Sequence, residues 1–259
     1  MLSLLSLQEY LRFKARQHHE VISSSPFTIF FHPTDASPES NYAIPDVVGD
    51  SGLQDSLVRL PSIFTERARK PRLQFIDDES SHLLSVLPSC GWTQEEQSQV
   101  MICTPEICRP APTIPGLAIA TLSYESSVEK IREGLDTNAL GFDPQAEAST
   151  IHEAEEFRSS LMLSRAFTAY LHAQPVGAGM FTDIHEGLTE LVGITTLEPF
   201  RRQGIAAALT AYMAQSAFQQ GAALVFLIAA NAQAGRVYER VGFHPYATRV
   251  VYESSASSV

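Results

Sequence analysis

Leu197-Glu-Pro-Phe-Arg-Arg-Gln-Gly-Ile-Ala-Ala-Ala-Leu209 joins an expected strand to an expected helix and carries the spacing Arg201-x-x-Gly204-x-Ala206. Small residues at a helix start let a ligand approach backbone amides that have no intrahelical acceptor. Such a helix start binds phosphate oxygens, and Arg201 and Arg202 add positive charge beside it. The same pattern also suits an ordinary turn in which the glycine begins the helix and the alanines pack.

A second motif favours the phosphate-binding interpretation. It begins thirty residues after Arg201 and reads Asn231-x-x-Ala234-x-x-x-Tyr238-x-x-x-Gly242-Phe243. Asn231 ends an apolar stretch typical of a buried strand, and Tyr238 lies two turns into the helix that follows. In this context the two motifs resemble the acetyl-coenzyme A signatures of the GNAT superfamily of N-acetyltransferases. The resemblance covers about residues 115–254.

The resemblance implies an α/β (α+β) fold, with a mixed central sheet flanked by helices, and acetyl-CoA as co-substrate without a metal. In the family, the strand before the first signature parts from its neighbour and leaves main-chain groups for the pantetheine arm. Leu197 would bond that arm through its main chain, amides 202–207 would hold the pyrophosphate, and Asn231 would contact the arm beyond the next strand. The residues expected to bind the coenzyme are Leu197, Arg201, Arg202, Gln203, Gly204, Ile205, Ala206, Ala207, Asn231 and Tyr238.

The resemblance also suggests two catalytic residues, Tyr238 and Glu190. The transfer needs an amine with a free lone pair, a donor to the thioester carbonyl and a proton for the departing thiolate. Glu190 lies at the spacing of the base glutamate in the histone acetyltransferase branch, Tyr238 would protonate sulfur, and a main-chain amide near Leu197 would polarise the carbonyl. Glu190 could instead be a solvated strand-end carboxylate and Tyr238 a core aromatic, while His185 or water could act as the base.

Composition excludes several other classes. The 259 residues are 44% hydrophobic, as in a soluble globular protein. With 18 Lys and Arg against 29 Asp and Glu, the net charge of −11 disfavours nucleic acid as a partner. No apolar run approaches ~18 residues, so we expect no membrane span, and the N-terminal stretch is typical of an amphipathic helix rather than a signal peptide. Cys90, Cys103 and Cys108 suggest reduced thiols and a cytoplasmic location.

A proline-rich stretch, Cys108–Gly116, suggests a boundary between an N-terminal domain, 1–114, and an acetyltransferase domain, 115–259. Residues 32–52 suggest a long loop, and Gln174-Pro175 suggests the turn of a hairpin. Hydrophobic periodicity predicts helices over 53–68, 80–87, 128–135, 151–162, 204–219 and 232–241, and strands over 72–76, 99–103, 117–122, 166–174, 176–182, 188–197, 224–229 and 247–252.

The order helix, strand, helix, Gly-aromatic, strand occurs twice, at 53–103 and at 204–252, with Gly91-Trp92 in the place of Gly242-Phe243. The N-terminal domain is therefore a candidate degenerate copy of the same fold. The nearest counterpart of the phosphate-binding turn, Gly49-Asp-Ser-Gly52, is acidic. An unrelated helical cap is the alternative.

The predicted function is transfer of an acetyl group from acetyl-CoA to a primary amine, by direct attack in a ternary complex. The acceptor would be a small molecule or a protein amine, and the protein a monomer or a homodimer. The alternative is a non-catalytic module that binds or senses acyl-CoA.

Overall fold

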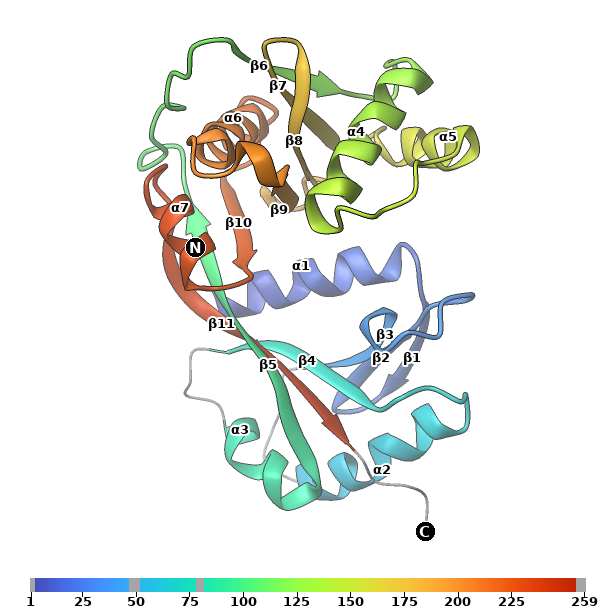
Figure 1. The fold of residues 1–259 in the computed structure, drawn as a ribbon. Helices are drawn as coiled ribbons and strands as arrows, with labels where there is room; N and C mark the ends of the chain where they lie inside the picture. Colours follow the sequence, from blue (N-terminus) through green and yellow to red (C-terminus); the bar gives the residue numbers. More distant parts are fainter. Residues whose placement is uncertain (1–2, 47–51, 78–81, 255–259) are drawn as a thin grey trace. The chain divides into compact units, whose positions relative to one another are not determined.

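The chain forms two compact units in a computed structural model that describes residues 3–46, 52–77 and 82–254 (Figure 1). Unit 1 comprises Met1–Val100 with Tyr246–Val259, and unit 2 comprises Met101–Pro245. These bounds differ from the expected 1–114 and 115–259. The proline-rich stretch lies inside unit 2, and the end of the chain belongs to unit 1. No described helix is both long enough and apolar enough to cross a membrane.

Unit 1 contains a sheet with the strand order β1-β2-β3-β4-β11-β5. Its core includes Phe31, Leu57, Phe64 and Trp92. The elements that contribute to it are α1 (Leu4–Arg16), β1 (Glu20–Ser24), β2 (Phe27–Phe31), η1 (Pro38–Ser40), β3 (Asn41–Pro45), α2 (Leu53–Thr65), β4 (Arg72–Asp77), α3 (His82–Val86), η2 (Leu87–Cys90), β5 (Trp92–Cys103) and β11 (His244–Ser254).

Unit 2 contains the strand order β5-β10-β9-β8-β7-β6, to which β5 contributes only its last residues. Helix α6 covers one side of these strands, and α4 and α5 cover the other (Figure 1). The elements are β6 (Leu117–Leu122), α4 (Val128–Phe142), α5 (Ile151–Ser160), β7 (Arg165–Leu171), β8 (Gln174–Phe181), β9 (Leu188–Thr196), η3 (Glu198–Phe200), α6 (Ile205–Gln219), β10 (Leu224–Ala229) and α7 (Ala232–Glu239).

The two units repeat one topology. In each, three antiparallel strands are followed by a helix and a fourth strand that pairs parallel with the third. Both helices begin at a left-handed glycine, Gly52 with φ 78° and Gly204 with φ 84°. This repeat supports the degenerate copy and excludes a helical cap. Gly49-Asp-Ser of the acidic turn lies outside the described residues.

The final strands of the two repeats are exchanged, which accounts for the difference in domain bounds. Strand β11 follows the second repeat in sequence but pairs antiparallel with β4 of the first, from Thr248↔Asp77 to Glu253↔Arg72. Strand β5 follows the first repeat, and its last residues lie beside β10 of the second. Local sequence patterns do not predict such an exchange, because an apolar strand can pair equally well with a strand of either repeat.

The sequence missed three strands and misplaced one turn. Strands β1 and β2 were not predicted, and β3 lies within the stretch expected to be a loop. The β7–β8 turn is formed by His172 and Ala173, both with positive φ, rather than by Gln174-Pro175. Positive φ at both central residues is what a type I′ hairpin turn requires, and closure of the hairpin overrides the weak preference of these residue types for that conformation.

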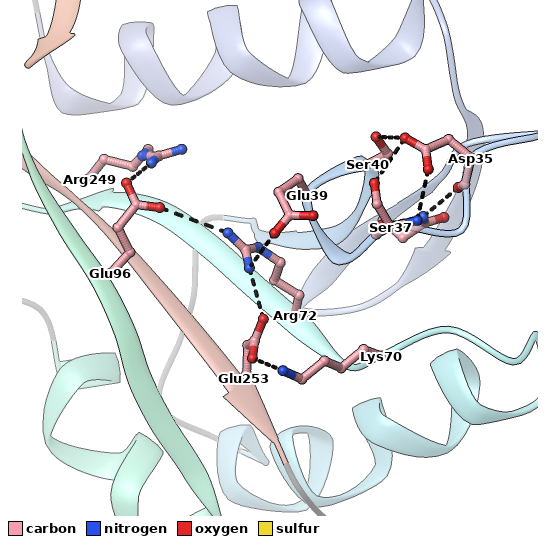
Figure 2. Close-up of polar contacts among 10 residues, drawn as sticks. Asp35, Ser37, Glu39, Ser40, Lys70, Arg72, Glu96, Arg249 and Glu253 are labelled. Carbon is pink, nitrogen blue, oxygen red and sulfur yellow. Dashed lines mark hydrogen bonds and ion pairs between the residues drawn. The ribbon is translucent and has the colours of Figure 1, made fainter. Parts of the chain in front are cut away.

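Charged side chains on and beside β4, β5 and β11 of unit 1 form a network around the buried pair Arg72 and Glu253 (Figure 2). Arg72 Nη1 donates to Glu253 Oε1 at 2.8 Å, and Lys70 pairs with the other oxygen of Glu253. The side chains of Arg72 and Glu253 are only 10% and 8% exposed. A buried carboxylate with two cationic partners holds these strands in register.

Glu96 extends this network to Arg249 on the neighbouring strand (Figure 2). Burial alone would raise the pKa of Glu96. The hydrogen bond from Ser98 and the charges of Arg249 and Arg72 outweigh burial, so the pKa lies below its ordinary value. Glu96 therefore stays ionised at neutral pH.

Replacing Glu253 with glutamine is expected to lower the free energy of unfolding by about 3 kcal/mol, because the variant keeps the shape but leaves the buried Arg72 without its carboxylate. Urea denaturation measures the change. The matched control is Glu39→Gln, since Glu39 is 71% exposed and 3.9 Å from Arg72. The control should cost under about 0.5 kcal/mol. Equal losses in both variants would contradict the assignment.

Candidate active site

Strands β9 and β10 of unit 2 pair over only part of their length. The parallel register runs from Leu188↔Leu224 to Leu191↔Leu227. Beyond it, β9 continues to Thr196 while pairing with β8 on its other side, and β10 continues to Ala229. The register of the two strands therefore ends after Leu191, as expected, and we call this break in pairing between their carboxyl ends the opening.

A β-bulge marks the part of β9 that borders this opening. The register with β8 shifts between Ala178 and Met180, and Gly193 has φ 64°. Asn138 of α4 donates from Nδ2 to the carbonyl of Gly193 at 2.6 Å. A bulge leaves one residue unpaired and re-aims the main chain, so Gly193 and Asn138 shape the wall of the opening. Neither residue is predicted from the sequence as part of the site; the signal present is a lone glycine inside a strand pattern.

The loop from β9 to α6 ends in an open helix N-terminus. The first amide bonded within α6 is that of Ala208, which donates to the Gly204 carbonyl at 3.0 Å. Among the described residues, we find no backbone acceptor for the amides of 202–207. Positive φ at Gly204 is what requires glycine there, because a Cβ would meet only Ile114 Cδ1, at 3.5 Å. Six consecutive open amides suit a diphosphate.

The two arginines of the motif differ in role. Arg201 donates from Nε to the Thr196 carbonyl and from Nη2 to the Gly141 carbonyl, both at 3.0 Å. Its guanidinium thus ties the loop to the ends of β9 and α4. Arg202 and Gln203 are exposed, and Arg202 has φ 62°. Arg201 therefore braces the loop. Positive charge beside a bound diphosphate stays a prediction, and the exposed Arg202 is the better candidate for it.

The main chain of Leu197 is already bonded within the protein. Its amide donates to the Val176 carbonyl at 2.9 Å, and its carbonyl accepts from the Phe200 amide at 2.9 Å. The Leu197 amide is therefore engaged with β8. Coenzyme binding by the Leu197 main chain, and a donor to the thioester carbonyl near it, stay predictions.

Asn231 and Tyr238 lie at the start of α7 and within it. Asn231 caps the helix, since its Oδ1 accepts from the Ala234 amide at 3.0 Å. Tyr238 packs against the core on the α6 side, with its ring 6.3 Å from that of Phe243. Burial raises the pKa of Tyr238, so its phenol stays protonated at neutral pH. A protonated phenol is what a donor to a thiolate requires.

Glu190 lies on β9, one residue before the last pair of the β9–β10 register, and is only 6% exposed. Its backbone amide donates to Thr182 Oγ1 at 3.2 Å. Because the residue is buried, the interpretation of Glu190 as a solvated strand-end carboxylate is wrong. His185 and Glu186 lie in the β8–β9 connection, where His185 bridges to Leu188 and Glu186 has φ 49°.

Two cavities lie in unit 2. The larger, about 480 Å³, is bordered by Leu197 and by α4 residues that include Glu129, Glu133 and Asp136. Three carboxylates against one arginine make it a poor site for coenzyme phosphates. The smaller cavity, about 80 Å³, lies under α4 and reaches Val192 and Gly193 of β9.

Comparison with known proteins identifies the class of fold. The chain is similar to a GCN5-related N-acetyltransferase from Kribbella flavida, with a TM-score of 0.81 and 20% identity over 99% of this chain and 97% of that one. It is also similar to a GCN5-related N-acetyltransferase from Sphaerobacter thermophilus (TM-score 0.68, 18% identity, 96% and 87% covered). A tandem GNAT protein from the clavulanic acid biosynthesis pathway is similar at TM-score 0.67 and 14% identity, with 92% and 83% covered. No curated protein matches the chain.

These likenesses define the mixed α/β fold of the acyltransferases. Residues 130–243 match the acetyltransferase (GNAT) family, and this part of the chain belongs to it. Members of the family transfer an acyl group from an acyl-CoA to an acceptor, and the protein is an acyltransferase. The tandem neighbour agrees with the repeated topology of the two units.

Proposed function

We propose that the protein transfers an acetyl group from acetyl-CoA to a primary amine by direct attack in a ternary complex. The observation that carries this proposal is the opening between β9 and β10, which leads to the open amides of residues 202–207. The pyrophosphate binds those amides, and the pantetheine arm lies between the parted strands. Asn231 lies beyond the end of β10 and contacts the arm there.

The chemistry needs one base and one acid. Glu190 removes a proton from the ammonium, directly or through water, and the nitrogen lone pair attacks the thioester carbonyl. The C–N bond forms, the C–S bond breaks, and Tyr238 donates its proton to the thiolate. The attacking nitrogen then loses its second proton to solvent, and solvent reprotonates Tyr238. A main-chain amide of the bulged part of β9 stabilises the developing oxyanion.

A module that binds acyl-CoA without turnover is the competing function. Burial of Glu190 beside the opening and the partly buried Tyr238, whose phenol has a raised pKa, favour the enzyme. Free thiols at Cys90, Cys103 and Cys108 support a cytoplasmic location. A thermal shift with acetyl-CoA tests coenzyme binding, and thiol release with a panel of primary amines tests turnover. Binding without thiol release from any amine would favour the module.

Replacing Glu190 with glutamine is expected to lower kcat about 30-fold with little change in the affinity for acetyl-CoA, because only the base is lost. Raising the pH should recover part of the rate, since more of the amine then arrives deprotonated. Steady-state thiol release between pH 7 and 10 measures both effects. Thr189→Ser, on the same strand, is the control and should retain the wild-type rate. A pH-independent loss would contradict the role of base.

A further inference from the structure

The smaller cavity of unit 2, about 80 Å³, lies between α4, α5 and strands β7–β9. Its wall is almost entirely apolar. Apolar cavities of this kind stay dry and bind apolar groups. The side chains that form most of the wall are Leu122, Ile131, Leu135, Phe157, Met180 and Val192.

Two polar side chains also border the cavity. The side-chain amide of Asn138 donates a hydrogen bond to the Gly193 carbonyl at 2.6 Å. Thr168 is fully buried, and its Oγ1 has no hydrogen bond of normal geometry in the described part of the chain. It lies near the Tyr170 phenol, whose pKa burial and Glu133 raise to about 12 and whose rise Thr168 only partly opposes. One uncommitted hydroxyl in an apolar wall does not hold an ordered water, which needs two to four polar partners.

The cavity adjoins the point where the acyl group is transferred. Val192 and Gly193 line it, and they are the first residues of β9 beyond the last pair with β10. Glu190 precedes Val192 by two residues, so both side chains face the same side of the sheet. The cavity therefore begins at the inner end of the opening, beside the proposed base.

We propose that this cavity binds a short alkyl group of about three or four carbons, carried by the acyl chain of the CoA thioester or by the amine acceptor. The inference rests on the proposed function, which places the thioester beside Val192. The size of the cavity limits the class of ligand, because a cavity that binds a benzene ring has a volume of about 150 Å³. Branched or linear alkyl groups fit, and aromatic rings do not.

Calorimetry with acetyl-, propionyl- and butyryl-CoA tests the acyl chain as the source. Each buried methylene should tighten binding about fourfold, so butyryl-CoA, with two more methylenes, should bind about 15-fold more tightly than acetyl-CoA. Ala178 lines the cavity on β8, and Gly179 beside it faces α6, where its Cβ would meet Met213. Ala178→Leu should abolish the preference and leave acetyl-CoA binding unchanged. Ala118→Leu, at an exposed position of β6, is the matched control.

Thiol release from acetyl-CoA with ethylamine, propylamine and butylamine tests the acceptor as the source. The rate should rise about fourfold per methylene, and Ala178→Leu should remove the rise. Leu135→Ala enlarges the cavity and should shift either preference to a longer chain, which keeps the test valid if Ala178→Leu does not fold. Circular dichroism checks folding.

Binding of CoA thioesters without any alkyl preference, in either series, would overturn this inference and leave the proposed function standing. If no thioester binds, the proposed function fails and this inference fails with it. The two failures are therefore distinguishable.

Discussion

Replacing Tyr238 with phenylalanine is expected to lower kcat by about 10²–10³-fold, because the departing thiolate loses its proton donor. The affinity for acetyl-CoA should change little, since the ring keeps its packing against Phe243. Steady-state thiol release gives kcat, and calorimetry gives the dissociation constant. Tyr212→Phe, on the outer part of α6, is the control and should retain kcat within about twofold. An unchanged kcat in Tyr238→Phe would remove the phenol from the mechanism.

The pH dependence gives a second readout of the same residue. Burial raises the pKa of Tyr238 above its ordinary value of 10.0, so the phenol stays protonated to a higher pH than an exposed tyrosine. The fall of kcat that reports loss of this proton should therefore lie above pH 10. It should be absent from Tyr238→Phe, which has no proton to lose. A fall of the same size in both proteins would assign the titration to another group.

Replacing Gly204 with aspartate is expected to weaken acetyl-CoA binding about 100-fold more than replacing it with asparagine. Both side chains tolerate positive φ better than other residues do, so the backbone strain at φ 84° is nearly the same in the two variants. They differ by one negative charge beside the proposed diphosphate. Two like charges ~4 Å apart at a protein surface repel by about 4 kcal/mol before screening.

Salt separates this charge effect from strain. The difference in acetyl-CoA affinity between Gly204→Asp and Gly204→Asn should shrink as ionic strength rises from 0.05 to 0.5 M. The Debye length shortens with added salt, so mobile ions screen the repulsion between the two charges more completely. The strain common to both should not respond to salt. Calorimetry with acetyl-CoA at each ionic strength measures the difference. Equal affinities for the two variants would place the phosphates away from this helix start.

Local sequence patterns identified the elements that carry the site. The strand at 224–229 has the predicted bounds, and α6 begins one residue after Gly204. These segments are long and strongly patterned, and the glycine required by positive φ marks the helix start directly. The same patterns gave the position of Tyr238 on a helix and of Glu190 on a strand, although their roles as acid and base stay proposals.

The roles of single side chains were harder to predict, because they depend on partners far along the chain. Arg201 was expected to place its positive charge beside a phosphate, but its guanidinium donates hydrogen bonds to the carbonyls of Thr196 and Gly141. The main chain of Leu197 was expected to bond the coenzyme arm, but its amide donates to the Val176 carbonyl and its carbonyl accepts from the Phe200 amide. A strand pattern indicates which residues are buried, and it does not indicate which neighbour each amide will meet.

The sequence by itself determined the GNAT signatures of this protein and the repeat of one element order, because turns, helix starts and apolar periodicity are local properties. Only the tertiary structure decided that β5 and β11 are exchanged between the repeats, that β9 carries a bulge held by Asn138, and that a small apolar cavity lies beside Val192. These features arise from contacts between residues distant in sequence. Such contacts are selected by how well whole surfaces pack, and no short stretch of sequence records that.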